Sequence, residues 1–378
     1  MQFIRLKNIN FFFLSLFLSF LVSCNQNNNF FVIYNEFSEA FPSDLIKTSD
    51  GGFIISGWGR SSNSFSASNG IAIKLDPDGK SEWAREYGRN SSFDKFNFAI
   101  SLGGGEYFLG GTKNSQTWII KINANGDILF EKIFVSSLSN TSEDACYDPI
   151  SNSLFIVGTS LIGDKDAAIL VVDNSGDVLS QKIFRSFGDE NIFSCNIDNS
   201  DSALILTGSK YAIGENGMDG LVMKFDFNGD FHWERTFGGA GGEVIWDSEI
   251  DNEGNYVFSG NSTFSASGTS ATILKLNKAG RMIHNEYFEN TPNSAAKNII
   301  KRLDNSFTVI GRAGEHSGHK NNMLLILNLN KNGDFVSHKV VSKQIGLEGK
   351  IAIETNSGEI LVAGSSSQRN IFTIKITQ

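Results

Sequence analysis

Acidic residues that recur at regular places are the residues of this chain best suited to chemistry. Each lies 14 to 18 residues ahead of a glycine that ends a strand-like apolar segment, and Lys297 takes this place before Gly311. If the repeats close into a ring, we expect these side chains at one mouth of its channel, as a site for a cation or a polyhydroxyl ligand. The alternative is structural, because an acid there could accept backbone N–H bonds that join neighbouring repeats. The six acids are Glu39, Asp94, Asp144, Glu190, Glu243 and Glu348.

Other combinations of residues that could do chemistry are sparse. His316 and His319 are spaced like metal ligands, but no third histidine is near, so exposure to solvent is the better interpretation. Nucleophile-elbow, zinc-protease and phosphate-loop motifs do not occur. Trp58, Phe65 and Phe264 fall in or beside expected loops, where aromatic rings could stack on sugars. We therefore predict no catalytic residue, no metal site and no cofactor.

The elements that position these residues follow a period near fifty. Seven strand-like segments end in a glycine, at intervals of 54, 47, 50, 52, 51 and 53 residues. This period, in a sequence whose pattern is typical of strands rather than helices, indicates a β-propeller. The glycines are Gly57, Gly111, Gly158, Gly208, Gly260, Gly311 and Gly364.

The sequence of each repeat predicts four short strands joined by tight turns. In the first repeat, Asp50-Gly51-Gly52 and Asp76-Pro77-Asp78-Gly79 supply the turns. The third-to-fourth turn recurs with an Asp or Asn at its start, and a calcium loop is excluded because the downstream bidentate glutamate is missing. We expect these side chains to cap their own turns. They are Asp76, Asn123, Asp173, Asp226, Asn277 and Asn330.

The last repeat stops after its third strand, at Ile371 to Ile376. The segment Phe30–Phe37 aligns with the fourth strands of other repeats, for example Ser81–Gly88. We therefore expect an all-β, seven-bladed propeller of four-stranded antiparallel blades, closed by the N-terminal strand pairing in the last blade. Such closure would satisfy both edges that an open ring would expose.

Two segments carry a family resemblance. IKLDPDGKSEWAREYG at Ile73–Gly88 and MKFDFNGDFHWERTFGG at Met223–Gly239 resemble the secreted bacterial β-propeller repeats found in many envelope proteins. The resemblance covers about 345 residues. It implies the fold and not the function, because propellers carry unrelated chemistries.

The N-terminal segment has the features of a targeting signal. Arg5 and Lys7 precede an apolar run from Phe11 to Val22, which is too short to span a bilayer and fits a signal peptide. Leu21-Val22-Ser23-Cys24 resembles the bacterial lipobox, which implies a lipid on Cys24 and cleavage before it; an ordinary secretory signal is the alternative. We therefore expect a signal peptide over 1–23, the lipidated Cys24 with a polar tether over 24–29, and one propeller domain over 30–378. Asn25 stands where the inner-membrane retention signal of many Gram-negative lipoproteins has Asp, which favours the outer membrane if the cell has one.

Charge and cysteine content restrict the partners. Residues 1–23 hold two of the 32 basic residues and none of the 41 acidic ones, which leaves a net charge of −11 from Cys24 on. Such an acidic chain is not attracted to phosphate backbones, so nucleic-acid binding is not expected. Cys146 and Cys195 follow small residues in neighbouring first strands. Taking the two positions as equivalent, we expect two free, buried thiols.

These observations favour a lipid-anchored binding or scaffold module of the cell envelope, which presents a loop face to an envelope protein or a glycan. The second hypothesis is an extracellular polysaccharide lyase or hydrolase with an acidic site at the channel mouth. A quinoprotein is a third, but the regular tryptophan motifs of that class are not found. The positions of the titratable groups distinguish the first two hypotheses. Carboxylates with shifted pKa values that converge in a deep pocket would favour an enzyme, whereas a flat polar face would favour a binding module.

Overall fold

Every element that the structure describes is a β-strand. The structure is a computed structural model, and it describes residues 31–60, 67–88, 93–134, 140–161, 163–211, 217–239, 241–264, 268–288, 293–314, 322–341 and 346–377. Among these residues there is no helix that could cross a membrane. Cys24, Phe65, His316 and His319, with the predicted signal peptide and tether, lie outside the described residues.

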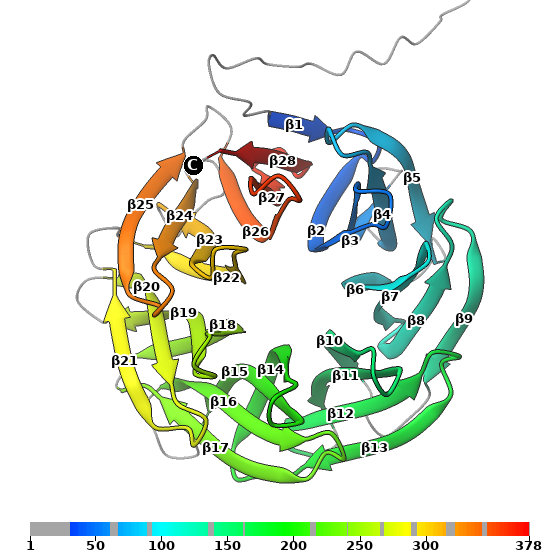
Figure 1. Ribbon diagram of the computed structural model, residues 1–378. Coiled ribbons are helices and arrows are strands. Elements are labelled where there is room, and N and C mark those ends of the chain that lie inside the picture. The colour runs from blue at the N-terminus through cyan, green and yellow to red at the C-terminus, as the bar shows by residue number, and fades with distance from the viewer. Residues whose placement is uncertain are drawn as a thin grey trace, which may run out of the picture.

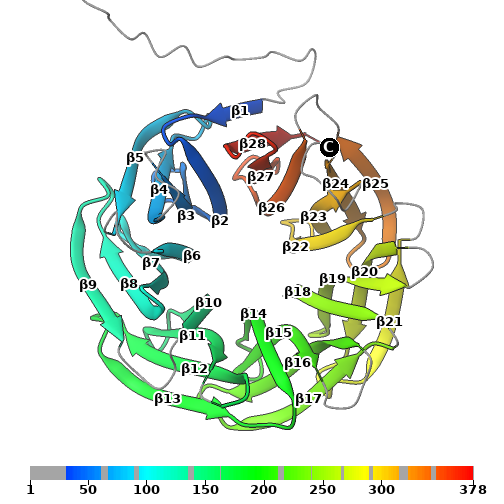
Figure 2. The same cartoon turned by 180° about the vertical axis from the view of Figure 1, so that it is seen from behind.

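The strands follow one another in antiparallel groups of four, arranged as a ring around a central space (Figures 1 and 2). The first two groups are β2 (Glu39–Lys47), β3 (Phe53–Arg60), β4 (Asn69–Leu75) and β5 (Ser81–Tyr87), then β6 (Lys95–Gly103), β7 (Glu106–Lys113), β8 (Gln116–Ile122) and β9 (Ile128–Phe134). The next group is β10 (Asn140–Asp148), β11 (Ser153–Ser160), β12 (Asp166–Asp173) and β13 (Val178–Phe184).

Two further groups of four share one bridge. They are β14 (Asp189–Asp198), β15 (Ala203–Tyr211), β16 (Met218–Asp226) and β17 (Phe231–Phe237), and β18 (Gly242–Ile250), β19 (Tyr256–Phe264), β20 (Gly268–Leu276) and β21 (Met282–Tyr287). A parallel bridge between Met218 and Gly242 joins them into one eight-stranded sheet.

The remaining strands are β22 (Ala295–Lys301), β23 (Phe307–Ala313), β24 (Met323–Leu329) and β25 (Phe335–Val341), then β26 (Leu347–Glu354), β27 (Ile360–Ser366), β28 (Ile371–Ile376) and β1 (Phe31–Tyr34). We call the first strand of each group its inner strand, because these strands surround the central space (Figure 1). The inner strands are β2, β6, β10, β14, β18, β22 and β26.

Burial follows the position of a strand within its group. β4 and β11 are buried at every residue, as continuous apolar runs predict, because neighbouring sheets cover both of their faces. The outer strand β25 is exposed over its centre. The core lies between successive sheets, where Phe155 and Ile169 of one group pack with Leu204 and Leu221 of the next.

The turns between third and fourth strands are capped as the sequence predicts. The Oδ1 atom of Asp76 accepts the backbone N–H groups of Asp78 and Lys80 at 3.0 and 2.8 Å. The same pair of bonds is made by Asn123, Asp173, Asp226, Asn277 and Asn330. Capping of their own turns is therefore the role of these Asp and Asn side chains.

The two ends of the described chain meet in one sheet. β1 pairs antiparallel with β28, with Phe31 opposite Ile374 and Tyr34 opposite Ile371. The hydroxyl of Tyr34 donates to the carbonyl oxygen of Gly79 at 2.7 Å, which ties this sheet to the β4–β5 turn of the next group.

The prediction of two free thiols is wrong, because Cys146 and Cys195 form a disulfide with their Cα atoms 6.1 Å apart. The two positions are not equivalent. Cys146 lies opposite Phe155, three residues before Gly158, whereas Cys195 lies opposite Leu206, two residues before Gly208. Since a shift of one residue turns a strand's side chain to the other face, the two sulfurs face each other.

Candidate functional site

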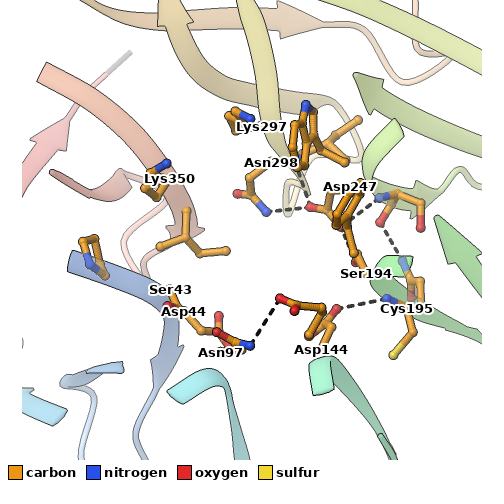
Figure 3. A pocket seen from close by; sticks show the side chains of 18 of the residues that line it. Ser43, Asp44, Asn97, Asp144, Ser194, Cys195, Asp247, Lys297, Asn298 and Lys350 are labelled. Carbon is orange, nitrogen blue, oxygen red and sulfur yellow. Dashed lines mark hydrogen bonds between the residues drawn. The ribbon is translucent and has the colours of Figure 1, made fainter. Parts of the chain in front are cut away.

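The candidate site is the cavity enclosed by the inner strands, with a volume of about 630 Å³ (Figure 3). Every inner strand has a β-bulge opposite or just beyond its partner's landmark glycine. Each bulge contributes one extra residue that lines the cavity. We call these seven residues the bulge ring; they are Ser43, Asn97, Glu143, Phe193, Trp246, Lys297 and Lys350.

The landmark glycines are what allow the bulges to form. A Cβ atom on Gly158 would overlap the carbonyl oxygen of Thr141, and one on Gly208 would overlap that of Asn191. Both carbonyls precede a bulge in the facing inner strand. The glycine period of the sequence therefore marks the places where an inner strand approaches its neighbour closely and turns a side chain into the cavity.

Two aromatic side chains and a lysine form one side of the bulge ring. The rings of Phe193 and Trp246 lie 4.8 Å apart, and the Lys297 ammonium lies 3.2 Å from the centroid of the Trp246 ring. Trp246 is held further by its indole N–H, which donates to Asn261 at 2.6 Å. Burial, and after it the charge of Lys350, lower the pKa of Lys297 to about 7.

The other charged members of the ring have counter-ions. The Lys350 ammonium lies 2.8 Å from a carboxylate oxygen of Glu348. Glu143 lies 3.7 Å from the Lys95 ammonium, and the Asn97 amide donates to it at 3.3 Å.

Three carboxyl groups follow the bulges and point to the same space, from Asp44, Asp144 and Asp247 (Figure 3). Each accepts the backbone N–H of its own next residue and a backbone N–H of another inner strand. The second bond comes from Ala99 to Asp44 at 2.7 Å, from Cys195 to Asp144 at 2.9 Å and from Ile299 to Asp247 at 3.1 Å. These carboxyls thus join successive sheets, and among them Asp144 belongs to the six acids for which the sequence left this structural role as the alternative.

Their position deep in the ring shifts their ionisation. Burial, and after it the charge of Asp44, raise the pKa of Asp144 to about 8. Burial raises the pKa of Asp44 to about 6, against the hydrogen bonds from Ala99 and Leu45. Glu249, which also lines the cavity, has its pKa raised by burial to about 7. Part of this carboxyl cluster is therefore protonated at neutral pH.

Of the six acids that the sequence singled out, Asp144 lines the cavity and the others do not. Glu39 pairs with Arg369 at 2.6 Å, Glu190 with Lys210 at 3.1 Å, and Glu348 with Lys350. Asp94 is fully buried and accepts the N–H of Asn114, and Glu243 accepts from the Ser262 hydroxyl at 2.6 Å. These five acids take part in local bonds near the start of inner strands.

The search by spacing missed Asp44 and Asp247, together with the whole bulge ring except Lys297. A window of 14 to 18 residues mixes positions on both faces of a strand, because the side-chain period is two. Counted back from each landmark glycine, the ring residues fall at 14 or 15 positions. A narrower window centred on the bulge is the signal that could have found them.

The other side chains of interest lie in different places. Trp58 lines the cavity and stacks on Phe41, with ring centroids 4.3 Å apart. His232, His284 and His338 lie on the outer strands β17, β21 and β25. Within the described ranges, no group of three or more His, Cys, Asp or Glu side chains is placed to hold a metal ion.

Comparisons with known proteins concern the fold. No family model and no curated protein matches the chain. The Neurospora crassa Pan2 WD40 domain is similar with a TM-score of 0.58, 11% identity and 90% of each chain covered. A structure of YCF48 bound to D1 peptide has a TM-score of 0.57 and 9% identity, and covers 97% of this chain and 100% of that one.

The periplasmic gluconolactonase PpgL of Pseudomonas aeruginosa is similar with a TM-score of 0.54 and 11% identity, over 90% of this chain and 95% of that one. At such identities a likeness concerns the fold alone. The chain thus has an all-β, propeller-like fold of repeated four-stranded antiparallel blades, as these structures do.

Proposed function

We propose that this protein is a ligand-binding module of the cell envelope, held by a lipid on Cys24, and that the bulge ring is its binding site. In this proposal the described strands form seven blades, and β1 closes the ring by completing the blade of β26–β28. The pairing of β1 with β28 supports the closure. The lipobox-like segment before Cys24 supports the anchor, with the outer membrane favoured.

One observation carries the binding role. The seven ring positions are structurally equivalent, yet they hold six residue types, from Ser43 and Asn97 to Trp246 and Lys297. The bulge geometry is the same at all seven positions, so it does not by itself explain why the residue types differ. A set of different polar, charged and aromatic groups around one cavity is what recognition of an asymmetric ligand requires.

The experiment places a photoreactive amino acid at Phe193, inside the cavity, and at Val336, which is 61% exposed on an outer strand, as the control. Irradiation of intact cells should give a discrete adduct from position 193 and none from 336. Adducts from position 336 alone would place the partner surface on the rim and contradict a cavity site.

The anchor is tested separately by Cys24→Ala. We expect this variant to lose its partition into the detergent phase and to keep its signal peptide, as an intact-mass measurement would show. Full partition into detergent with an unchanged N-terminal mass would contradict the lipid anchor.

A polysaccharide lyase or hydrolase is the second candidate, and the carboxyl cluster favours it. Groups with pKa values of about 6 and 8 in one cavity are suited to paired base and acid roles. Against it, Asp44 and Asp144 each use their oxygens for two backbone N–H groups. Release of reducing ends from envelope polysaccharide, abolished in Asp144→Asn, would establish the enzyme.

A further inference from the structure

The charges of the bulge ring leave one cation without a counter-ion. Lys350 pairs with Glu348, and Glu143 is near Lys95 and Asn97. The Lys297 ammonium makes no hydrogen bond or ion pair with the part of the chain that the structure describes; its contact is with the Trp246 ring. The ring therefore presents to the cavity one amine that no carboxylate of the described ranges binds directly.

This ammonium is also held in position. Trp246 supports it on one side, and Phe193 and Asn261 fix Trp246 in turn. An ammonium has three donors and no acceptor, and a cation–π contact leaves those on the cavity side for a ligand. A positioned cation of this kind is suited to a single carboxylate.

The opposite side of the ring suits hydroxyl groups. Ser43, Asn97 and Glu143 offer a hydroxyl, an amide and carboxylate oxygens from β2, β6 and β10, whereas Lys297 is on β22. Figure 3 shows Ser43 and Asn97 across the cavity from Lys297. Acidic groups nearby, such as Asp44, oppose densely charged anions such as phosphate. A volume of about 630 Å³ lies in the range of small-ligand sites.

Building on the proposed function, we infer that the ligand is a carboxylated sugar, a uronic acid or short uronate oligomer. Its carboxylate pairs with Lys297, and its hydroxyls bind the side formed by Ser43, Asn97 and Glu143. The ring thus selects a ligand that places one carboxylate at Lys297 and hydroxyl groups at the opposite side of the cavity.

Proton coupling is the signature of such a site. An anion beside Lys297 stabilises its charged form, so binding takes up a proton wherever free Lys297 is partly neutral. Because the pKa of Lys297 is about 7, affinity should fall as pH rises from 6 to 8.5, approaching tenfold per pH unit above 7. Lys350, Glu348 and Arg312 act on the same ammonium, and Asp247 and Glu249 face the cavity from β18.

The test uses the full chain, with trigalacturonate as the probe and its fully methyl-esterified form as a neutral control of the same size. Calorimetry at pH 6.5 should show tighter binding of the acid form. Lys297→Met should weaken that binding at least tenfold and leave the ester unchanged, whereas the exposed-lysine control Lys339→Met should change neither. Ser43→Ala should weaken the acid and the ester alike.

Lys297→Arg separates the lysine from the carboxyl groups of the cavity. Arginine stays charged throughout, so this variant should keep binding at pH 8.5 and lose the proton uptake that calorimetry in two buffers measures. A merely structural role of Lys297 would change affinity without changing the number of protons taken up.

Three results would overturn the inference. They are equal binding of acid and ester, equal effects of Lys297→Met and Lys339→Met, and binding of a peptide with a free terminal carboxylate where trigalacturonate fails. In the first and third cases, hydrogen-exchange protection of residues 244–249 by the ligand would keep the cavity as a binding site. The proposed function itself fails on the separate crosslinking result, adducts from Val336 alone.

Discussion

Gly158 lies directly beneath the carbonyl oxygen of Thr141, so closely that a Cβ atom on the glycine would overlap this oxygen. Thr141 belongs to the inner strand β10, just before the bulge that turns Glu143 into the cavity. The same contact between a glycine of the second strand and the inner strand recurs around the ring, so one backbone relationship underlies both the sequence period and the site.

Gly158→Ala should therefore destabilise the protein, because either the bulge or the strand pairing must shift. Overpacking against backbone costs about 1–3 kcal/mol. The control is Gly239→Ala, where a Cβ would meet nothing within 4 Å. Chemical denaturation measures both, and equal unfolding midpoints for the two variants would contradict the close approach.

The disulfide between Cys146 and Cys195 should stabilise the contact between the sheets of β10 and β14. For a loop of this length the chain-entropy effect is about 4 kcal/mol, and measured effects are typically about 2–4 kcal/mol. We expect Cys146→Ala/Cys195→Ala to lower the unfolding free energy by that order. Intact mass before and after reduction gives the bond directly, and two free thiols in the oxidised protein would contradict it.

The carboxyl cluster should make stability depend on pH. Folding raises the pKa of Asp144 from 3.8 to about 8, so the folded state holds more protons than the unfolded state between these values. By linkage, this contribution to stability is present below about pH 4 and is lost as pH rises to 8.

Asp144→Asn keeps an oxygen for the N–H of Cys195 but cannot ionise. Between pH 5 and 8 the unfolding free energy of this variant should fall less than that of the wild type. The difference should be on the order of 1 kcal/mol or more, since one unit of pKa corresponds to about 1.4 kcal/mol. Melting curves across this range measure it; the exposed Asp78→Asn, on a β-turn, is the control. Parallel pH profiles of wild type and Asp144→Asn would show that Asp144 ionises normally.

The pairing of β1 with β28 should be needed for cooperative folding. Deleting residues 30–37 removes the strand and the apolar contacts of Phe31 and Ile33 with the last sheet. Burial contributes about 25 cal/mol per Å² of apolar surface, so we expect a loss of several kcal/mol, with aggregation or a broad melt. Tyr34→Phe, which removes the bond to Gly79, should cost about 1–3 kcal/mol and keep a sharp transition. A deletion variant that melts like the full chain would contradict the closure.

Much of the architecture could be predicted from short-range sequence patterns. Turn residues such as Asp76 and Gly79 act within a few positions of themselves, so their structure follows from the neighbouring sequence. Buried second and third strands appear as apolar runs for the same reason. The similarity of Phe30–Phe37 to other fourth strands pointed to the last repeat, where Phe31–Tyr34 pair with β28.

The candidate site depends on contacts between strands, which short-range sequence patterns do not reveal. A bulge adds one residue to one strand and not to its partner, and that single residue decides whether a side chain faces the cavity or the neighbouring sheet. Asp144 and Lys297 were found by spacing, whereas Asp44, Asp247 and Trp246 were not.

The cysteines show the same limit. Cys146 and Cys195 are 49 residues apart, and the landmark glycines of their repeats, Gly158 and Gly208, are 50 apart. This difference of one residue reverses the side that a sulfur faces and turns two expected thiols into a disulfide. The sequence by itself determined the repeats, their strands and their turns, because these follow from short-range pattern. Tertiary structure alone decided which side chains meet in the cavity, because that depends on the register between strands and on the approach of one sheet to the next.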